Sequence, residues 1–343
     1  MGSSFSRRSS SKNDAAEFLS APPPPPPRGM SGLNSMGFDI VDTKKGVKGG
    51  GCHRLAVSGM LVTDENFGLY VESGSPYNHV ARCCMDQAQA MMQEACNLER
   101  VETSRGAVLK SKERHETWLV VVPGKGRVDA GIFSRNLLMK EGLEAGSAMK
   151  ITSEAVRNGW GLVLLNPNYS CPFDSSYAML NLRTQWEEVV KPLTAAAAVA
   201  DPSGPSLKIH FLAHSAGGAQ LACMLGDYDS FDWLGKIAFT DSTHSLRQVS
   251  TFKSRGLMHY LQSDNARYYR SNDSLFPVSE YPYMAPFTLE DNARSSQESA
   301  RVRTEQKYWS DRFGNIPTYF CGTAEHARTT WKAEDDIVEF LRT

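Results

Sequence analysis

Short apolar runs and segments with helical periodicity alternate along most of the chain. The run at residues 117–122 ends at a Pro-Gly-Lys-Gly turn, and the run at residues 160–165 ends at Asn-Pro-Asn. Between them, residues 147–158 have the pattern of an amphipathic helix. This order of strand, helix and strand predicts a parallel β-α-β unit.

The same alternation continues toward the end of the sequence. We expect further helices at residues 77–98, through Leu182 and Val190, after Ala216 and near 331–341. We expect further strands at residues 207–213, 236–240 and 317–321. Apolar strands between amphipathic helices predict an α/β fold with a mainly parallel central sheet and helices on both faces. Residues from about 245 to 315 show no clear strand, and this length favours an insertion near the site.

The first 45 residues or so have the composition of a disordered arm, which leaves 46–343 as the folded domain. Ser, Arg and Lys dominate the start, and six prolines span Pro22 to Pro27. The opening Met-Gly-Ser-Ser-Phe-Ser matches the N-myristoylation pattern, with Gly2 as the acylated residue and Ser6 at the Ser/Thr position. Basic residues follow directly, so we expect a cytoplasmic protein held peripherally on a membrane surface.

Composition and charge limit the classes of function that this protein can have. The chain of 343 residues has 37 Lys plus Arg against 38 Asp plus Glu, so no overall positive field favours direct nucleic-acid binding. No apolar run reaches the length of a membrane span. The seven cysteines are odd in number and scattered, which indicates reduced thiols. We predict no metal or cofactor.

The strand at residues 207–213 runs directly into small-x-Ser-x-Gly and then a helix. This is the layout of a nucleophile elbow, with Ser215 at its tip. The turn is sharp, so small residues are needed two positions before and after the serine. Ala213 and Gly217 meet that need, although Ala stands where Gly is usual. Ser215 is therefore the candidate nucleophile.

Acyl transfer also requires hydrogen-bond donors for the oxyanion. The residue after the serine supplies one backbone N–H, and a loop after an earlier strand supplies another. Here these donors are Ala216 and one of Gly124, Lys125 or Gly126. The absence of Gly-Lys-Ser/Thr in this loop excludes a phosphate-binding P-loop.

A serine nucleophile needs a base, which should follow it near the last strand. Residues 321–326 provide a strand end, a glycine turn and His326, while His214 and His244 are competing histidines. The orienting carboxylate is expected after a strand between serine and base. Asp241 is the candidate, and Glu325 is the alternative.

Five blocks of the sequence resemble, in order and content, the Argonaute-binding-protein-two (Arb2) domain family. They are VVPGKG at 121–126, GWGLVLLNPN at 159–168, AHSAGG at 213–218, AFTDSTH at 238–244 and GTAEH at 322–326. The resemblance covers roughly residues 50 to 343. It implies an α/β-hydrolase-like fold and carries the elbow serine and the final histidine over to Ser215 and His326.

Two functions follow as alternatives. The first is a serine hydrolase of the esterase or amidase type, acting on a small acyl substrate through Ser215, His326 and an acid. The second is a non-catalytic scaffold for a protein partner, because some family members act in Argonaute-linked heterochromatin formation, gene silencing or cotranscriptional regulation. The second function implies a nuclear location.

Overall fold

The computed structural model describes residues 27–43, 53–194, 207–244, 255–287, 300, 304, 307–308 and 314–343. Gly2 and the rest of the predicted lipidation motif lie outside these residues. Within the described part of the chain, no helix combines the length and apolar character needed to cross a bilayer.

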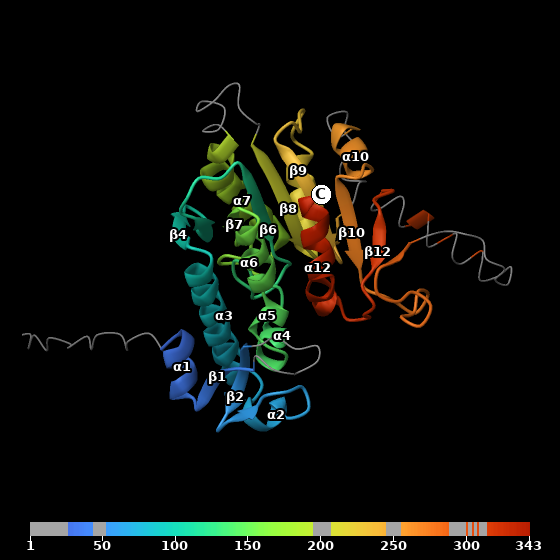
Figure 1. The fold of residues 1–343 in the computed structure, drawn as a ribbon. Helices are drawn as coiled ribbons and strands as arrows, with labels where there is room; N and C mark the ends of the chain where they lie inside the picture. The colour runs from blue at the N-terminus through green and yellow to red at the C-terminus, as the bar shows by residue number, and fades with distance from the viewer. Residues whose placement is uncertain are drawn as a thin grey trace, which may run out of the picture.

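A nine-stranded sheet forms the centre of the molecule, in the order β11-β12-β10-β9-β8-β6-β7-β5-β4 (Figure 1). The six strands from β12 to β7 pair in parallel, and β4, β5 and β11 are antiparallel to their neighbours. Their bounds are β4 Leu98–Thr103, β5 Gly106–Ser111, β6 Thr117–Val122, β7 Gly161–Leu164, β8 Lys208–His214, β9 Leu234–Thr240, β10 Ala266–Arg270, β11 Ala285–Pro286 and β12 Thr318–Phe320. The expected mainly parallel sheet is confirmed.

Helices cover both faces of this sheet. They are α3 Ser75–Ala95, α4 Arg135–Lys140, α5 Leu143–Gly146, α6 Met149–Arg157, α7 Ser175–Gln185 with the π-helical η1 Trp186–Val190, α9 Ala216–Leu225, α10 Arg255–Leu261, η4 His326–Arg328 and α12 Thr329–Arg342. Figure 1 shows α6 and α12 in front of the strands. Every helix predicted from the sequence is present, with ends shifted by a few residues.

The two faces of the sheet bury separate hydrophobic clusters, because side chains alternate along each strand. In β6, Leu119 and Val121 join the cluster with α3, α6 and α12. Trp118, Val120 and Val122 join the other cluster, with α7, α9 and α10. These five side chains are all at most 1% exposed, so β6 is buried on both faces as its continuous apolar sequence predicts.

The polar segment after residue 245 contains a strand of the central sheet, contrary to the sequence expectation. β10 pairs in parallel with both β9 and β12. Its sequence Ala-Arg-Tyr-Tyr-Arg hides this role, because arginine is rarely buried. Arg270 is 3% exposed, but its guanidinium pairs with Asp273 at 2.6 Å and lies 5.0 Å from the ring centroid of Phe320.

Residues 29–42 are also ordered, although the sequence analysis placed them in a disordered arm. They form α1 Gly29–Ser35 and β1 Phe38–Asp42; a small antiparallel sheet joins β1 to β2 His53–Val57 and β3 Met60–Leu61, followed by α2 Phe67–Tyr70. Leu33 is fully buried. A Cβ at Gly32 would lie 2.5 Å from the Cys83 Sγ of α3, so glycine permits this close helix contact. A helix as short as α1 has too few apolar positions to form a helical pattern that can be recognised in the sequence.

Candidate active site

Ser215 stands at a sharp turn between β8 and α9. Its backbone has φ 53° and ψ −127°, a conformation that costs a non-glycine residue about 1–3 kcal/mol. The turn is fixed by hydrogen bonds from the Ser215 N–H to the Thr240 carbonyl and from the Thr243 N–H to the Ser215 carbonyl, at 2.9 and 3.0 Å. A Cβ at Gly217 would lie 2.4 Å from the Pro123 carbonyl oxygen. The predicted need for small residues around the serine is therefore met.

Three side chains that are far apart in sequence lie together at the carboxyl ends of the strands. The Nε2 of His326 is 3.0 Å from the Ser215 Oγ, and its Nδ1 is 2.5 Å from the Asp241 Oδ2. Asp241 follows β9, and His326 follows β12 at the start of η4. This is the geometry of a nucleophile, a base and an orienting acid.

Asp241 is held as a carboxylate. Burial by itself would raise its pKa, but hydrogen bonds from His326 and Ser271 outweigh that effect and leave the pKa below its ordinary value. The Ser271 N–H donates to Oδ1 at 3.1 Å and the Ser271 hydroxyl to Oδ2 at 2.8 Å. The backbone N–H of Asp241 donates to the Tyr269 carbonyl at 2.7 Å. Tyr269 of β10 and Ser271, which follows this strand, therefore hold Asp241 in place.

The alternative residues have other partners. Glu325 is on the surface, where its carboxylate accepts from Arg328 at 2.8 Å. His244 is fully buried, lies 2.8 Å from the Ser242 hydroxyl and stacks on the ring of Phe239. His326 is therefore the imidazole that contacts Ser215, and Asp241 is the carboxylate that contacts His326.

The ring of His214 packs against the imidazole of His326. Burial is the main reason that the pKa of His214 falls to about 3, and nearby His326 lowers it further, so the ring is neutral. Its Nδ1 lies 3.1 and 3.2 Å from the hydroxyls of Thr240 and Thr330. The two imidazoles are 4.9 Å apart with an angle of 31° between their planes. The side chain of His326 is 52% exposed, so the site is open to solvent.

The Pro-Gly-Lys-Gly loop lies against the serine. A Cβ at Gly124 would be 2.8 Å from the Ser215 Cβ, so the loop can approach only with glycine here. Asn168 holds the loop: its side-chain amide donates to the Gly124 carbonyl at 2.8 Å and accepts from the Gly126 N–H at 3.3 Å. Lys125 is exposed, and its ammonium donates to the Ser175 hydroxyl at 3.3 Å.

Sequence reasoning missed Ser271 and Asn168 as parts of this arrangement. Ser271 follows β10, which gave no strand signal. Asn168 was noted only as part of the turn that ends β7. Its position after a strand end was the available signal, because polar residues at the carboxyl ends of parallel strands gather at one edge of a sheet.

Several known proteins are similar to this chain in sequence, although no protein-family model matches it. A FAM172 family protein homolog of Caenorhabditis elegans is 32% identical over 140 residues, which are 39% of this chain and 41% of that protein. A cotranscriptional regulator ARB2A homolog of Dictyostelium discoideum is 26% identical over 209 residues, 47% of this chain and 51% of that one. Human cotranscriptional regulator ARB2A is 28% identical over 89 residues, 23% of this chain and 21% of that one. The chain therefore matches about half or less of the length of these relatives.

Solved structures with a similar arrangement include two histone deacetylases. One, from Saccharomyces cerevisiae, has a TM-score of 0.46 and 12% identity, covering 77% of this chain and 97% of that one. The histone deacetylase Clr3 has a TM-score of 0.47 and 14% identity, covering 76% of this chain and 38% of that one. The chain is thus similar over part of its length to ARB2A and FAM172 proteins, and its mainly parallel sheet with a strand-turn-helix elbow has the arrangement of an α/β-hydrolase fold.

Proposed function

We propose that the protein is a serine hydrolase that acts on a carboxylic ester or amide. The observation that carries this proposal is the pair of contacts of His326, with the Ser215 hydroxyl at 3.0 Å and with Asp241 at 2.5 Å. A serine beside a surface histidine is common, but an elbow serine with a strained backbone and an oriented imidazole is the arrangement that activates a hydroxyl.

In the reaction, the Ser215 Oγ bonds to the carbonyl carbon while its proton passes to the Nε2 of His326. Collapse of the tetrahedral intermediate breaks the bond to the alcohol or amine, which leaves with that proton. Water then adds to the acyl-enzyme while one of its protons passes to His326, and the bond to the Ser215 Oγ breaks as that oxygen takes the proton back, so that the carboxylic acid departs. Asp241 keeps the Nδ1 proton in place and stabilises the imidazolium.

The oxyanion is proposed to bind to backbone donors on both sides of Ser215. Ala216 is the first residue of α9, where an N–H has no acceptor within the helix. The Gly126 N–H donates to Asn168, so the second donor is assigned to Gly124 or Lys125. Loss of one such donor costs about 10²-fold or more in rate.

A fluorophosphonate probe tests the proposal without a known substrate. Such probes form a covalent bond with activated serines, so the wild-type chain should be labelled and Ser215→Ala should not. Ser176→Ala is the matched control, because Ser176 is an exposed serine on α7 and none of the triad side chains contacts it in the hydrogen bonds described. Equal absence of labelling in the wild type and in Ser215→Ala contradicts the proposal.

A second candidate function rests on the names of the relatives, which are cotranscriptional regulators. In that case the hydrolase fold serves as a scaffold for a protein partner, and the protein acts in the nucleus. In cells that lack the protein, Ser215→Ala should then restore the regulated transcripts as well as the wild type does. Failure of Ser215→Ala, with rescue by Ser176→Ala, favours the hydrolase.

Gly2 is proposed as a lipidation site that places the protein on a membrane. The matching residues are the first six of the sequence, followed by Arg7 and Arg8. Labelling with an alkyne analogue of myristate should mark the wild type and not Gly2→Ala. Labelling of both forms, or of neither, contradicts this proposal.

A further inference from the structure

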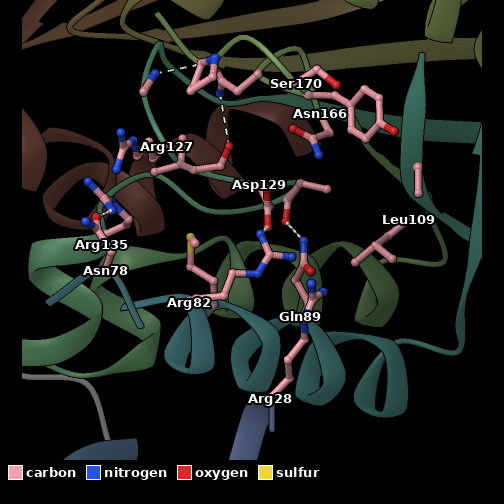
Figure 2. A pocket seen from close by; sticks show the side chains of 18 of the residues that line it. Arg28, Asn78, Arg82, Gln89, Leu109, Arg127, Asp129, Arg135, Asn166 and Ser170 are labelled. Atoms are coloured by element: carbon pink, nitrogen blue, oxygen red, sulfur yellow. Dashed lines mark hydrogen bonds and ion pairs between the residues drawn. The ribbon is translucent and has the colours of Figure 1, made fainter. Parts of the chain in front are cut away.

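A cavity of about 540 Å³ lies beside the proposed active site and apart from it. It is formed between α3, the loop that follows β6 and the loop that follows β7 (Figure 2). Gly126 and Asn168 line it, whereas Ser215, Asp241 and His326 do not. Its volume is in the range of small-molecule sites.

Five arginines line this cavity, and two of them are neutralised by carboxylates. Arg82 pairs with Asp86 at 3.1 Å and with Asp129 at 2.5 Å. Arg100 pairs with Glu102 at 2.7 Å. Three carboxylates therefore face these two arginines, so the five arginines and their partners together carry a net charge of about +2.

The other three arginines are Arg28, Arg127 and Arg135; none forms an ion pair within 4.0 Å among the described residues, although the charge of Arg28 acts on the carboxylate of Asp86. The Arg135 guanidinium is held by neutral groups, with a 2.9 Å hydrogen bond to the side-chain oxygen of Asn78. Arg127 lies 5.8 Å from the ring centroid of Phe173. The cavity therefore has an excess of positive charge, and the three arginines outside ion pairs come from the segment before α1, the loop after β6 and α4.

A buried amide at the wall of the cavity also lacks a partner. Asn166 is 8% exposed, and its side-chain Oδ1 has no hydrogen bond within the described structure. The side chain of Gln185 bonds to both backbone groups of Asn166: it accepts from the N–H at 2.8 Å and donates to the carbonyl at 2.9 Å. In Figure 2 the Asn166 side chain is at the upper right of the cavity and Arg127 and Arg135 are at the left. Such an amide can present its oxygen to a hydroxyl or its NH₂ to an anion.

We propose that this cavity binds a small molecule with one or more phosphate groups, held by Arg28, Arg127 and Arg135 and contacted by Asn166. A phosphate carries close to two negative charges and three acceptor oxygens, which several guanidinium groups can contact at once. A single carboxylate needs only one such group. Met85 and Leu109 supply apolar surface for the rest of the molecule.

Titration calorimetry on the full chain with pyrophosphate, inorganic phosphate and acetate tests the proposal. Pyrophosphate should bind more tightly than inorganic phosphate, and both should bind more tightly than acetate, which has a single carboxylate. The double variant Arg127→Gln/Arg135→Gln should weaken pyrophosphate binding about 100-fold or more, since each charge-assisted hydrogen bond accounts for at least about tenfold. The matched control is Arg157→Gln/Arg342→Gln, which removes the same charge from exposed arginines outside the cavity lining.

The proposal is overturned if pyrophosphate does not bind the wild type, if acetate binds as tightly, or if the control weakens binding equally. A second measurement uses the unmodified chain: pyrophosphate should protect Arg127 and Arg135 from phenylglyoxal, and equal modification with and without pyrophosphate overturns the proposal. Ser215→Ala should bind pyrophosphate with wild-type affinity, because Ser215 is not part of the cavity. The outcome is therefore independent of the proposed hydrolase activity.

Discussion

Replacing Asp241 by asparagine should leave the fold in place but stop His326 from acting as the base of the proposed triad. The carboxylate accepts from the Ser271 N–H at Oδ1, and the Ser271 hydroxyl and His326 Nδ1 both meet Oδ2, at 2.8 and 2.5 Å. In Asp241→Asn the amide oxygen can keep the first contact. The amide NH₂ then occupies the Oδ2 position and must donate, so Nδ1 of His326 has to accept.

This change fixes the imidazole in the wrong tautomer. With Nδ1 as acceptor, the proton of the neutral ring is on Nε2, which faces the Ser215 hydroxyl at 3.0 Å and can no longer take its proton. The same exchange in a serine protease lowers kcat by about 10⁴-fold. We expect a loss of that order here, equal to about 5 kcal/mol of activation free energy.

The assay is the second-order rate constant for fluorophosphonate labelling of Ser215, followed by fluorescence of the separated protein at pH 7.5. Asp335→Asn is the control, since Asp335 is an exposed carboxylate on α12 that pairs with Lys150 at 2.8 Å. It should be labelled at the wild-type rate. A loss of less than tenfold in Asp241→Asn refutes the idea that this carboxylate sets the tautomer of His326.

Three further predictions concern the loop beside Ser215, the hydrophobic core and the ionisation of Asp241. Gly124→Ala should lower the labelling rate by about 10²-fold or more, because its Cβ would stand 2.8 Å from that of Ser215 and displace an oxyanion donor; Gly68→Ala, with open space around it, should change nothing. Phe211→Ala, at a fully buried side chain stacked on Trp186, should lower the free energy of unfolding in urea by about 3–5 kcal/mol, and a loss below 1 kcal/mol contradicts the packing described. The stability that ionised Asp241 contributes should be complete above the ordinary aspartate pKa and disappear as the pH falls from about 4 through its lowered pKa. The difference in urea midpoint between wild type and Asp241→Asn should therefore be smaller at pH 3 than at pH 7, and an unchanged difference contradicts the lowered pKa.

The local part of the site could be predicted from the sequence because its causes are local. A buried strand, a turn that tolerates only small neighbours and a helix follow one another within residues 207–225, so steric limits on a few adjacent residues identify Ser215. The order of the later elements likewise pointed to Asp241 and His326. The α/β class followed from the alternation of apolar strands and amphipathic helices.

Only the tertiary structure decided which distant groups meet. β10 can be a buried strand of the central sheet because Arg270 pairs with Asp273 and lies over the ring of Phe320. Ser271, which follows this strand, is thereby placed against Asp241. Leu33 is buried because α3 covers it, although its neighbours read as a polar arm. The physical reason is the same in each case: burial and pairing of a polar or isolated side chain depend on partners far away in the sequence, and no local pattern contains those partners.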